Sequence, residues 1–132
     1  MRAFREAVEA GDLDAVEALL AEDVVFSSPV AFKPYSGRAV TAAILRAVAR
    51  VFEDFRYERE LAGADGRDHA LVFRARVGER ELTGCDFIHL DADGRIDELT
   101  VMVRPLSGAQ ALAAAMNAQF DRITREATER SV

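Results

Sequence analysis

The second half of the chain alternates apolar and polar residues with the period of two that β-strands require. Glycine-containing turns separate the alternating runs at Asp65-Gly66, Gly78-Glu79 and Asp93-Gly94, where glycine accepts the positive φ of a tight hairpin. The pattern predicts a four-stranded antiparallel meander between Phe55 and Pro105. We expect one face of this sheet, turned toward the helices, to carry Leu71, Phe73, Ala75, Asp86, Ile88, Leu99, Val101 and Val103.

The first half of the chain follows helical periodicity instead. Its apolar spacing predicts one helix that ends at Gly11 and a second helix that Asp12 caps. Residues 23–28 form a short extended segment in this prediction, and residues 30–37 form a loop. Apolar residues then recur at helical spacing from Val40 to Phe52, which predicts a third amphipathic helix.

The end of the chain returns to helical spacing. Ser107 and Gln110 have the spacing of a capping box, which predicts a helix over residues 107–124. Its apolar stripe consists of Leu112, Met116, Phe120 and Ile123. We expect residues 125–132, which are polar, to fray. A chain of 132 residues has the length of one domain, here with a helix-and-sheet unit over residues 1–106.

Charge and cysteine content narrow the class of protein. The formal net charge is −6, from 17 basic and 23 acidic residues, which disfavours nucleic acids and anionic membranes as partners. Cys85 is the single cysteine, and the first ten residues lack the apolar core of a signal peptide. No apolar run approaches the roughly 20 residues that a membrane span needs. We therefore expect a cytoplasmic protein without nucleic-acid or membrane partners.

Asp86 is the leading candidate for chemistry, because it lies on the apolar row of its strand. A carboxyl group there is either satisfied by hydrogen bonds or kept partly protonated, so we expect apolar neighbours to raise its pKa. Tyr57 and Tyr35 are weaker catalytic candidates that could offer a phenol to the same pocket. His69, which shares the alternation of Leu71, is a further weak candidate.

No metal or cofactor is expected. Cys85 and His89 share one strand face, but four residues at roughly 3.3 Å each place them about 13 Å apart, too far to share a zinc ion. Asp91 to Gly94 lacks the further ligands of a calcium loop. The sequence also has no P-loop and no glycine-rich dinucleotide motif.

The opposite face of the sheet carries its own apolar strip. Phe87, Thr100 and Met102 alternate with the inward row and fall on the outer side. An exposed apolar strip of this kind is typical of association surfaces. We therefore expect a homodimer formed through the outer sheet face.

Three stretches carry a resemblance to a known superfamily. Residues 1–30 end in F-S-S-P-V, P-Y-S-G-R-A-V follows at residues 34–40, and C-D-F-I-H-L at residues 85–90 precedes a G-R-I turn. In this order they resemble the nuclear-transport-factor-2-like superfamily, with its ketosteroid isomerases and SnoaL-like polyketide cyclases, and most of all SnoaL-like proteins. The resemblance implies an α+β cone, in which three N-terminal helices pack on a strongly curved antiparallel sheet around a cavity and a C-terminal helix follows.

The functional residues of the relatives carry over only in part. Ser28 stands where the ketosteroid isomerases have their general-base aspartate, and Phe4 stands where they have an oxyanion-hole tyrosine. Asp86 alone matches, at the position of the protonated aspartate that donates to the oxyanion. Gly84 replaces the arginine of limonene-epoxide-hydrolase-like enzymes. The resemblance therefore argues against both of these activities.

Together, these features predict a pocket for a small hydrophobic molecule that bears oxygen, with Asp86 as hydrogen-bond donor or general acid/base in isomerase, cyclase or hydrolase chemistry. The alternatives are a non-catalytic binding module for a hydrophobic ligand and a dimeric protein-association domain. A second base in the cavity would favour the enzyme, and a uniformly apolar cavity would favour the binding module. The expected lining consists of Phe4, Phe26, Ser28, Phe32, Phe52, Phe73, Ile88, Leu99, Val101 and Val103.

Overall fold

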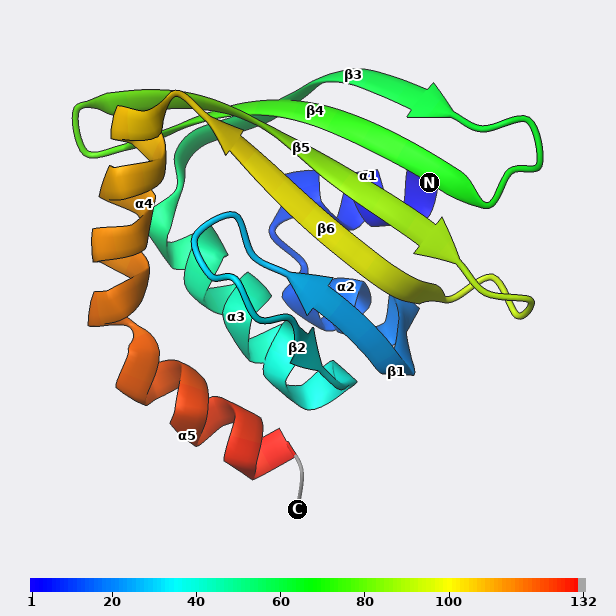
Figure 1. The fold of residues 1–132 in the computed structure, drawn as a ribbon. Helices are drawn as coiled ribbons and strands as arrows, with labels where there is room; N and C mark the ends of the chain where they lie inside the picture. Colours follow the sequence, from blue (N-terminus) through cyan, green and yellow to red (C-terminus); the bar gives the residue numbers. More distant parts are fainter. Residues whose placement is uncertain (131–132) are drawn as a thin grey trace.

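The computed structural model describes residues 1–130 and has helices packed against one face of a curved sheet (Figure 1). The sheet has the strand order β2-β1-β6-β5-β4-β3. The helices are α1 (Arg2–Ala10), α2 (Leu13–Leu19), α3 (Arg38–Val51), α4 (Leu106–Ala118) and α5 (Phe120–Arg130). The strands are β1 (Leu20–Ser27), β2 (Tyr35–Ser36), β3 (Glu53–Ala62), β4 (Asp68–Val77), β5 (Arg80–Leu90) and β6 (Ile96–Arg104).

Local sequence signals set the boundary between the first two helices. Gly11 ends α1 in the left-handed region, with φ 71°, and donates its backbone N–H to the Val8 carbonyl. Asp12 caps α2 by accepting a hydrogen bond from the Ala15 backbone N–H at 3.1 Å. The predictions for these two helices and for α3 are confirmed.

The predicted meander is confirmed as β3 to β6, which pair antiparallel in sequence order. The sequence had led us to expect an antiparallel sheet throughout, but one pairing in the observed sheet is parallel. Strand β1 runs parallel to β6, with Phe26 opposite Leu99. The two-residue strand β2, inside the predicted loop, pairs antiparallel with β1. Alternation along a strand reports which residues share a face, but it does not report which strand becomes the neighbour.

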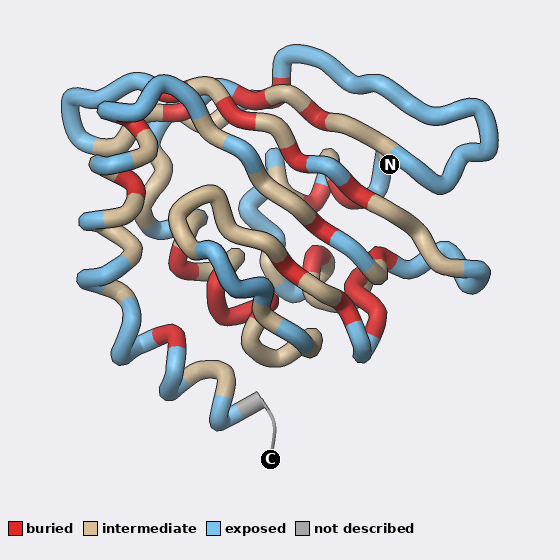
Figure 2. Tube along the Cα trace, in the orientation of Figure 1, coloured by how far each residue is buried: buried red, intermediate tan, exposed pale blue. Residues whose placement is uncertain are grey.

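Inward and outward faces follow the predicted alternation. Asp86 lies between Leu71 of β4 and Val101 of β6, and Ile88 lies opposite Leu99. Buried positions alternate along β4 and β5 (Figure 2). The helix-facing side therefore carries the core, and it also carries Asp86.

The C-terminal segment differs from the prediction in three respects. Helix α4 begins one residue early, with Pro105 as a cap residue that makes no side-chain capping bond, so the capping box at Ser107 does not form. The chain breaks at Gln119 into two helices, and α5 continues to Arg130. The segment predicted to fray is thus helical as far as Arg130, and residues 131–132 lie outside the described part of the chain.

Packing on α3 explains why α5 is helical. Ile123 is 7% exposed and packs in a cluster with Phe26 and Ile44. Glu126 lies 3.3 Å from the Arg50 guanidinium of α3. Phe120, by contrast, is 57% exposed, so it does not share the buried stripe that the sequence predicted.

Within residues 1–130, none of the helices combines the length and apolar character needed to cross a membrane.

Candidate functional site

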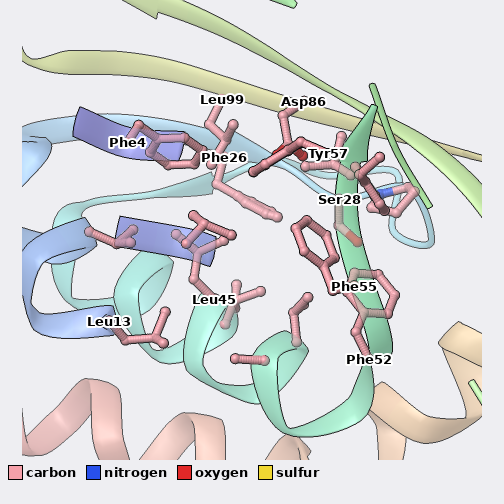
Figure 3. Close-up of a pocket in the computed structure, with 18 of the residues that line it drawn as sticks. Phe4, Leu13, Phe26, Ser28, Leu45, Phe52, Phe55, Tyr57, Asp86 and Leu99 are labelled. Atoms are coloured by element: carbon pink, nitrogen blue, oxygen red, sulfur yellow. The ribbon is translucent and has the colours of Figure 1, made fainter. Parts of the chain in front are cut away.

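A cavity of about 350 Å³ lies between the helices and the inward face of the sheet (Figure 3). It is close to the lower end of the roughly 300–1,000 Å³ typical of small-molecule sites. Helices α1, α2, α3 and α4 and five of the strands contribute to its wall, which is mainly apolar. The polar side chains in the lining are Glu9, Ser28, Tyr57 and Asp86.

Asp86 projects from β5 into this apolar wall and is 8% exposed. Burial penalises the charged carboxylate and raises the pKa of Asp86 from 3.8 to about 7. The hydrogen bond from Tyr57 opposes this rise, but it is the smaller effect. Asp86 therefore exchanges its proton near neutral pH, as a general acid or base requires.

Tyr57 of β3 completes a pair with Asp86. Its hydroxyl donates to Asp86 Oδ2 at 2.7 Å, and both residues are buried. Burial raises the pKa of Tyr57, and the negative charge of Asp86 raises it further. Tyr57 consequently remains protonated and keeps its donor role.

Aromatic rings form the wall beside this pair. The Phe55 ring stacks on Phe73 with centroids 5.0 Å apart and on Phe52 with centroids 5.9 Å apart. The Phe73 ring lies directly over Gly84 of the neighbouring strand, and a Cβ atom at that position would overlap the ring atom Cζ. Gly84 thus has a steric role in shaping the wall.

The structure brings most of the predicted site residues together. The ones that line the cavity are Asp86, Tyr57, Phe4, Phe26, Ser28, Phe52, Phe73, Leu99 and Val101. The Ser28 Oγ accepts a hydrogen bond from the Val30 backbone N–H at 3.2 Å.

Five predicted residues lie outside the lining. Phe32 is fully exposed in the loop between β1 and β2, and Tyr35 packs edge-on against Phe26 from outside the cavity. His69 bonds to the Gly66 carbonyl at 2.9 Å in its own hairpin. Ile88 is part of the hydrophobic core and Val103 packs against it, and neither residue lines the cavity. The alternation of residues along a strand correctly placed Ile88 and Val103 on the inward face of the sheet. It does not indicate how far along the cone each residue lies.

The sequence reasoning missed several lining residues. Phe55 and Leu45 had detectable signals, because each lies on the periodic apolar pattern of its element. Met116 of α4 was assigned to the stripe of the last helix, and it reaches the cavity because α4 closes one end of the cone. Glu9 gave no signal, since a glutamate on an amphipathic helix normally faces solvent.

One group of side chains could offer ligand atoms to a cation. His89, Asp97 and Glu98 bring such atoms within 4.8 Å of one another, and none of these residues lines the cavity. His89 Nδ1 already shares a hydrogen bond with Asp97 Oδ1 at 2.6 Å, and this contact raises the pKa of His89. A raised pKa favours the protonated imidazole, which opposes metal binding, so we assign no metal to this group.

The α+β cone with its inner cavity defines the fold class, and comparison with known proteins identifies the family. Residues 1–99 match the model of the SnoaL-like domain. The chain therefore belongs to the SnoaL-like family, within the nuclear-transport-factor-2-like fold. No curated protein sequence matches it.

Solved structures agree with this assignment. A steroid delta-isomerase from Pseudomonas aeruginosa is 49% identical, with a TM-score of 0.87 over 92% of this chain and 89% of that one. An uncharacterised protein with a cystatin-like fold from Silicibacter pomeroyi is 39% identical, with a TM-score of 0.87 over 95% and 89%. SalBIII, an epoxide hydrolase/cyclase-like enzyme of pyran ring formation in salinomycin, shares the fold at 20% identity, with a TM-score of 0.65 over 78% and 86%.

Proposed function

We propose that the cavity binds an apolar small molecule through a carbonyl or enolate oxygen, with protonated Asp86 as the hydrogen-bond donor. The observation that carries this proposal is a buried carboxyl group in a mainly apolar cavity wall, where burial raises its pKa to about 7. A neutral acid in such a site donates a strong hydrogen bond at little desolvation cost, because neither the donor nor the ligand oxygen needs to be charged beforehand.

The same group can perform acid/base chemistry. Protonated Asp86 donates to the ligand oxygen and stabilises the negative charge that develops there, while a solvent water molecule accepts the proton that leaves the adjacent carbon. Near neutral pH the deprotonated form is also populated, so Asp86 can accept a proton as well as donate one. Tyr57 holds the carboxyl in place through Oδ2. This supports an isomerase-type or cyclase-type reaction on a hydrophobic, oxygen-bearing metabolite.

The 49% identical relative directs the choice of test ligand, because its name specifies a steroid. Ser28 and Phe4 still depart from the general base and the tyrosine of the ketosteroid isomerases. We therefore propose ketosteroids as ligands of the cavity, without a proton shuttle through the position of Ser28.

The binding test uses androstenedione, a neutral and largely apolar ketone, in calorimetric titrations between about pH 5 and about pH 9. We expect the affinity to be constant below about pH 7 and to fall above it, because ionised Asp86 repels a carbonyl oxygen. The Asp86→Asn variant keeps an N–H donor that does not titrate, so its affinity should not change with pH. A wild-type affinity that is equally independent of pH would contradict the proposal.

Exchange in heavy water separates the enzyme from the non-catalytic binding module. If the protein is an enzyme of the proposed type, it speeds the exchange of the hydrogens beside the ketone carbonyl, as followed by proton NMR. Asp86→Asn should abolish this acceleration while it retains binding. Tight binding with no acceleration in the wild type would instead identify a binding module.

A homodimer through the outer sheet face is the second part of the proposal. Phe87 is 43% exposed and Met102 is 58% exposed, on adjacent strands β5 and β6. Phe87 lies opposite Thr100, and Cys85 lies opposite Met102, so the apolar positions form one continuous strip. Continuity of this kind supports association between two copies of the sheet.

A further inference from the structure

The cavity opens to solvent beside the end of α1. Glu9, Ala10 and Gly11 are exposed and line the cavity there, and Ala49 of α3 is an exposed lining residue as well. In Figure 3, Leu13, which follows this turn, lies at the end of the cavity remote from Asp86 and Ser28. The mouth is therefore built from small residues and one glutamate.

Among the described residues that line the cavity, Glu9 and Asp86 are the two that carry a carboxyl group, and none is basic. The Glu9 carboxylate is held in place by Arg5, whose Nε lies 3.4 Å from Glu9 Oε1. The Arg5 guanidinium also approaches Glu60 of β3 at 3.6 Å. Arg5 thus joins α1 to β3, and Glu9 is paired with it at the rim of the cavity.

Arg5 connects this mouth to the inner pair of polar groups. Its guanidinium carbon lies 5.9 Å from the centre of the Tyr57 ring. The negative charge of Glu9 contributes to the raised pKa of Tyr57, and the positive charge of Arg5 opposes it. Arg5 therefore contacts both the Glu9 carboxylate and the Tyr57 ring, and both of these residues line the same cavity.

We infer that the Glu9 carboxylate is a second ligand anchor, which accepts a hydrogen bond from a hydroxyl or amino group at the outer end of the ligand. This inference rests on the proposed function, which places the ligand carbonyl at Asp86. It adds the kind of chemical group at the outer end of the ligand. The ligand then has an apolar body, a carbonyl at its inner end and a hydrogen-bond donor at its outer end. A ligand whose outer end only accepts hydrogen bonds, or is anionic, meets a repulsive carboxylate.

Testosterone and androstenedione form a matched pair of ligands for the test. Both carry the same conjugated ketone on ring A, and they differ only on ring D, where testosterone has a hydroxyl donor and androstenedione has a keto acceptor. We expect the wild-type protein to bind testosterone more tightly by about tenfold, the usual size of one hydrogen bond to a charged group. Glu9→Gln should bring this ratio close to one, because a neutral amide can donate to the keto group.

Glu6→Gln is the control, since Glu6 lies on the same helix, pairs only loosely with Arg2 at 3.8 Å and does not line the cavity. It should leave the ratio unchanged. Thermal unfolding of both variants shows whether either change acts merely through stability, which would lower both affinities together and leave the ratio intact.

The outcomes separate the two claims. If both steroids bind and the wild-type ratio is near one, or if Glu9→Gln leaves a tenfold ratio in place, the role of Glu9 is wrong while the proposed function stands. If neither steroid binds to the wild-type protein, the proposed function is overturned and the role of Glu9 is overturned with it.

Discussion

The carboxyl group of Asp86 is placed where its ionised form is unfavourable. A rise in pKa from 3.8 to about 7 corresponds to about 4 kcal/mol of penalty on the charged form. Tyr57 recovers part of this cost through its hydrogen bond, but no lining residue provides a positive charge. A residue that weakens the fold in its charged form is typical of a site selected for chemistry.

The stability of the fold should consequently depend on pH in a defined direction. Between about pH 4 and about pH 7 the unfolded chain has lost the Asp86 proton while the folded protein still holds it, so the free energy of unfolding falls as pH rises. Above the folded pKa this dependence ends. Asp86→Asn removes it, and at about pH 8 the variant should be more stable than the wild type by up to about 4 kcal/mol.

Urea unfolding at a series of pH values measures this difference. The two proteins should converge as the pH falls below about 4, because Asp86 then becomes neutral in the unfolded state as well as in the folded state. A wild type that gains stability relative to Asp86→Asn as pH rises would show that Asp86 is stabilised as a carboxylate, and the proposed donor role would then be wrong.

The hydrogen bond from Tyr57 should change the pKa of Asp86 in a direction that can be measured. The Tyr57 hydroxyl lowers the pKa of Asp86, so Tyr57→Phe should raise that pKa further above about 7. Carbon NMR of the Asp86 carboxyl group during a pH titration measures the change. Tyr35→Phe is the matched control, because the Tyr35 ring lies outside the cavity, and an equal shift in both variants would contradict the assigned pair.

At the scale of elements, the sequence predicted those structural features that depend on residues close together in the chain. Alternation along β5 placed Asp86 on the inward face, and Gly11 and Asp12 marked the junction of two helices. The parallel pairing of β1 with β6 was not predictable in this way, because it joins Phe26 to Leu99 across most of the chain. The same limit applies to site residues. Phe32 is aromatic and near the pocket in sequence, but its loop turns it into solvent.

The contact between Gly84 and Phe73 links two strands to the shape of the cavity. A methyl group at Gly84 overlaps the Phe73 ring, which is itself stacked on Phe55 and cannot move freely. We expect Gly84→Ala to lower the free energy of unfolding by about 1–3 kcal/mol, as overpacked cores do. It should also weaken ligand binding, because a displaced ring enters the cavity.

Gly63→Ala is a suitable control for Gly84→Ala, because a Cβ atom at Gly63 meets its nearest neighbour at 3.4 Å, an ordinary contact. Chemical denaturation and ligand titration of both variants measure the two effects. Unchanged stability in Gly84→Ala would mean that the aromatic wall repacks without cost.

The last helix offers a comparison between two apolar residues that the sequence placed on one stripe. Ile123 packs against Phe26 and Ile44, so Ile123→Ala should lower the free energy of unfolding by about 2–4 kcal/mol. Phe120 is 57% exposed, and Phe120→Ala should change it by no more than about 0.5 kcal/mol. Equal effects in denaturant unfolding would show that α5 does not pack on α3 as described.

At the scale of the whole molecule, the two faces of one sheet have different surroundings. The inward face is covered by helices and carries the cavity with Asp86, whereas the outer face is left with an exposed apolar strip at Phe87 and Met102. The strands that position the candidate acid are therefore the same strands, β5 and β6, that would meet a second copy of the chain. Association would stiffen the wall of the cavity from behind.

Phe87 lies on the outer strip through which we propose that the chain forms a dimer. An aspartate at Phe87 places a charge in the centre of the strip and repels the same residue of a symmetry mate, so Phe87→Asp should convert the proposed dimer to a monomer. Phe120→Asp adds the same charge on an exposed apolar residue of α5 and should leave the dimer intact. Sedimentation equilibrium at tens of micromolar measures the mass of each variant. A wild-type protein that is monomeric there, or a Phe87→Asp variant that remains dimeric, would show that the outer strip is not the interface.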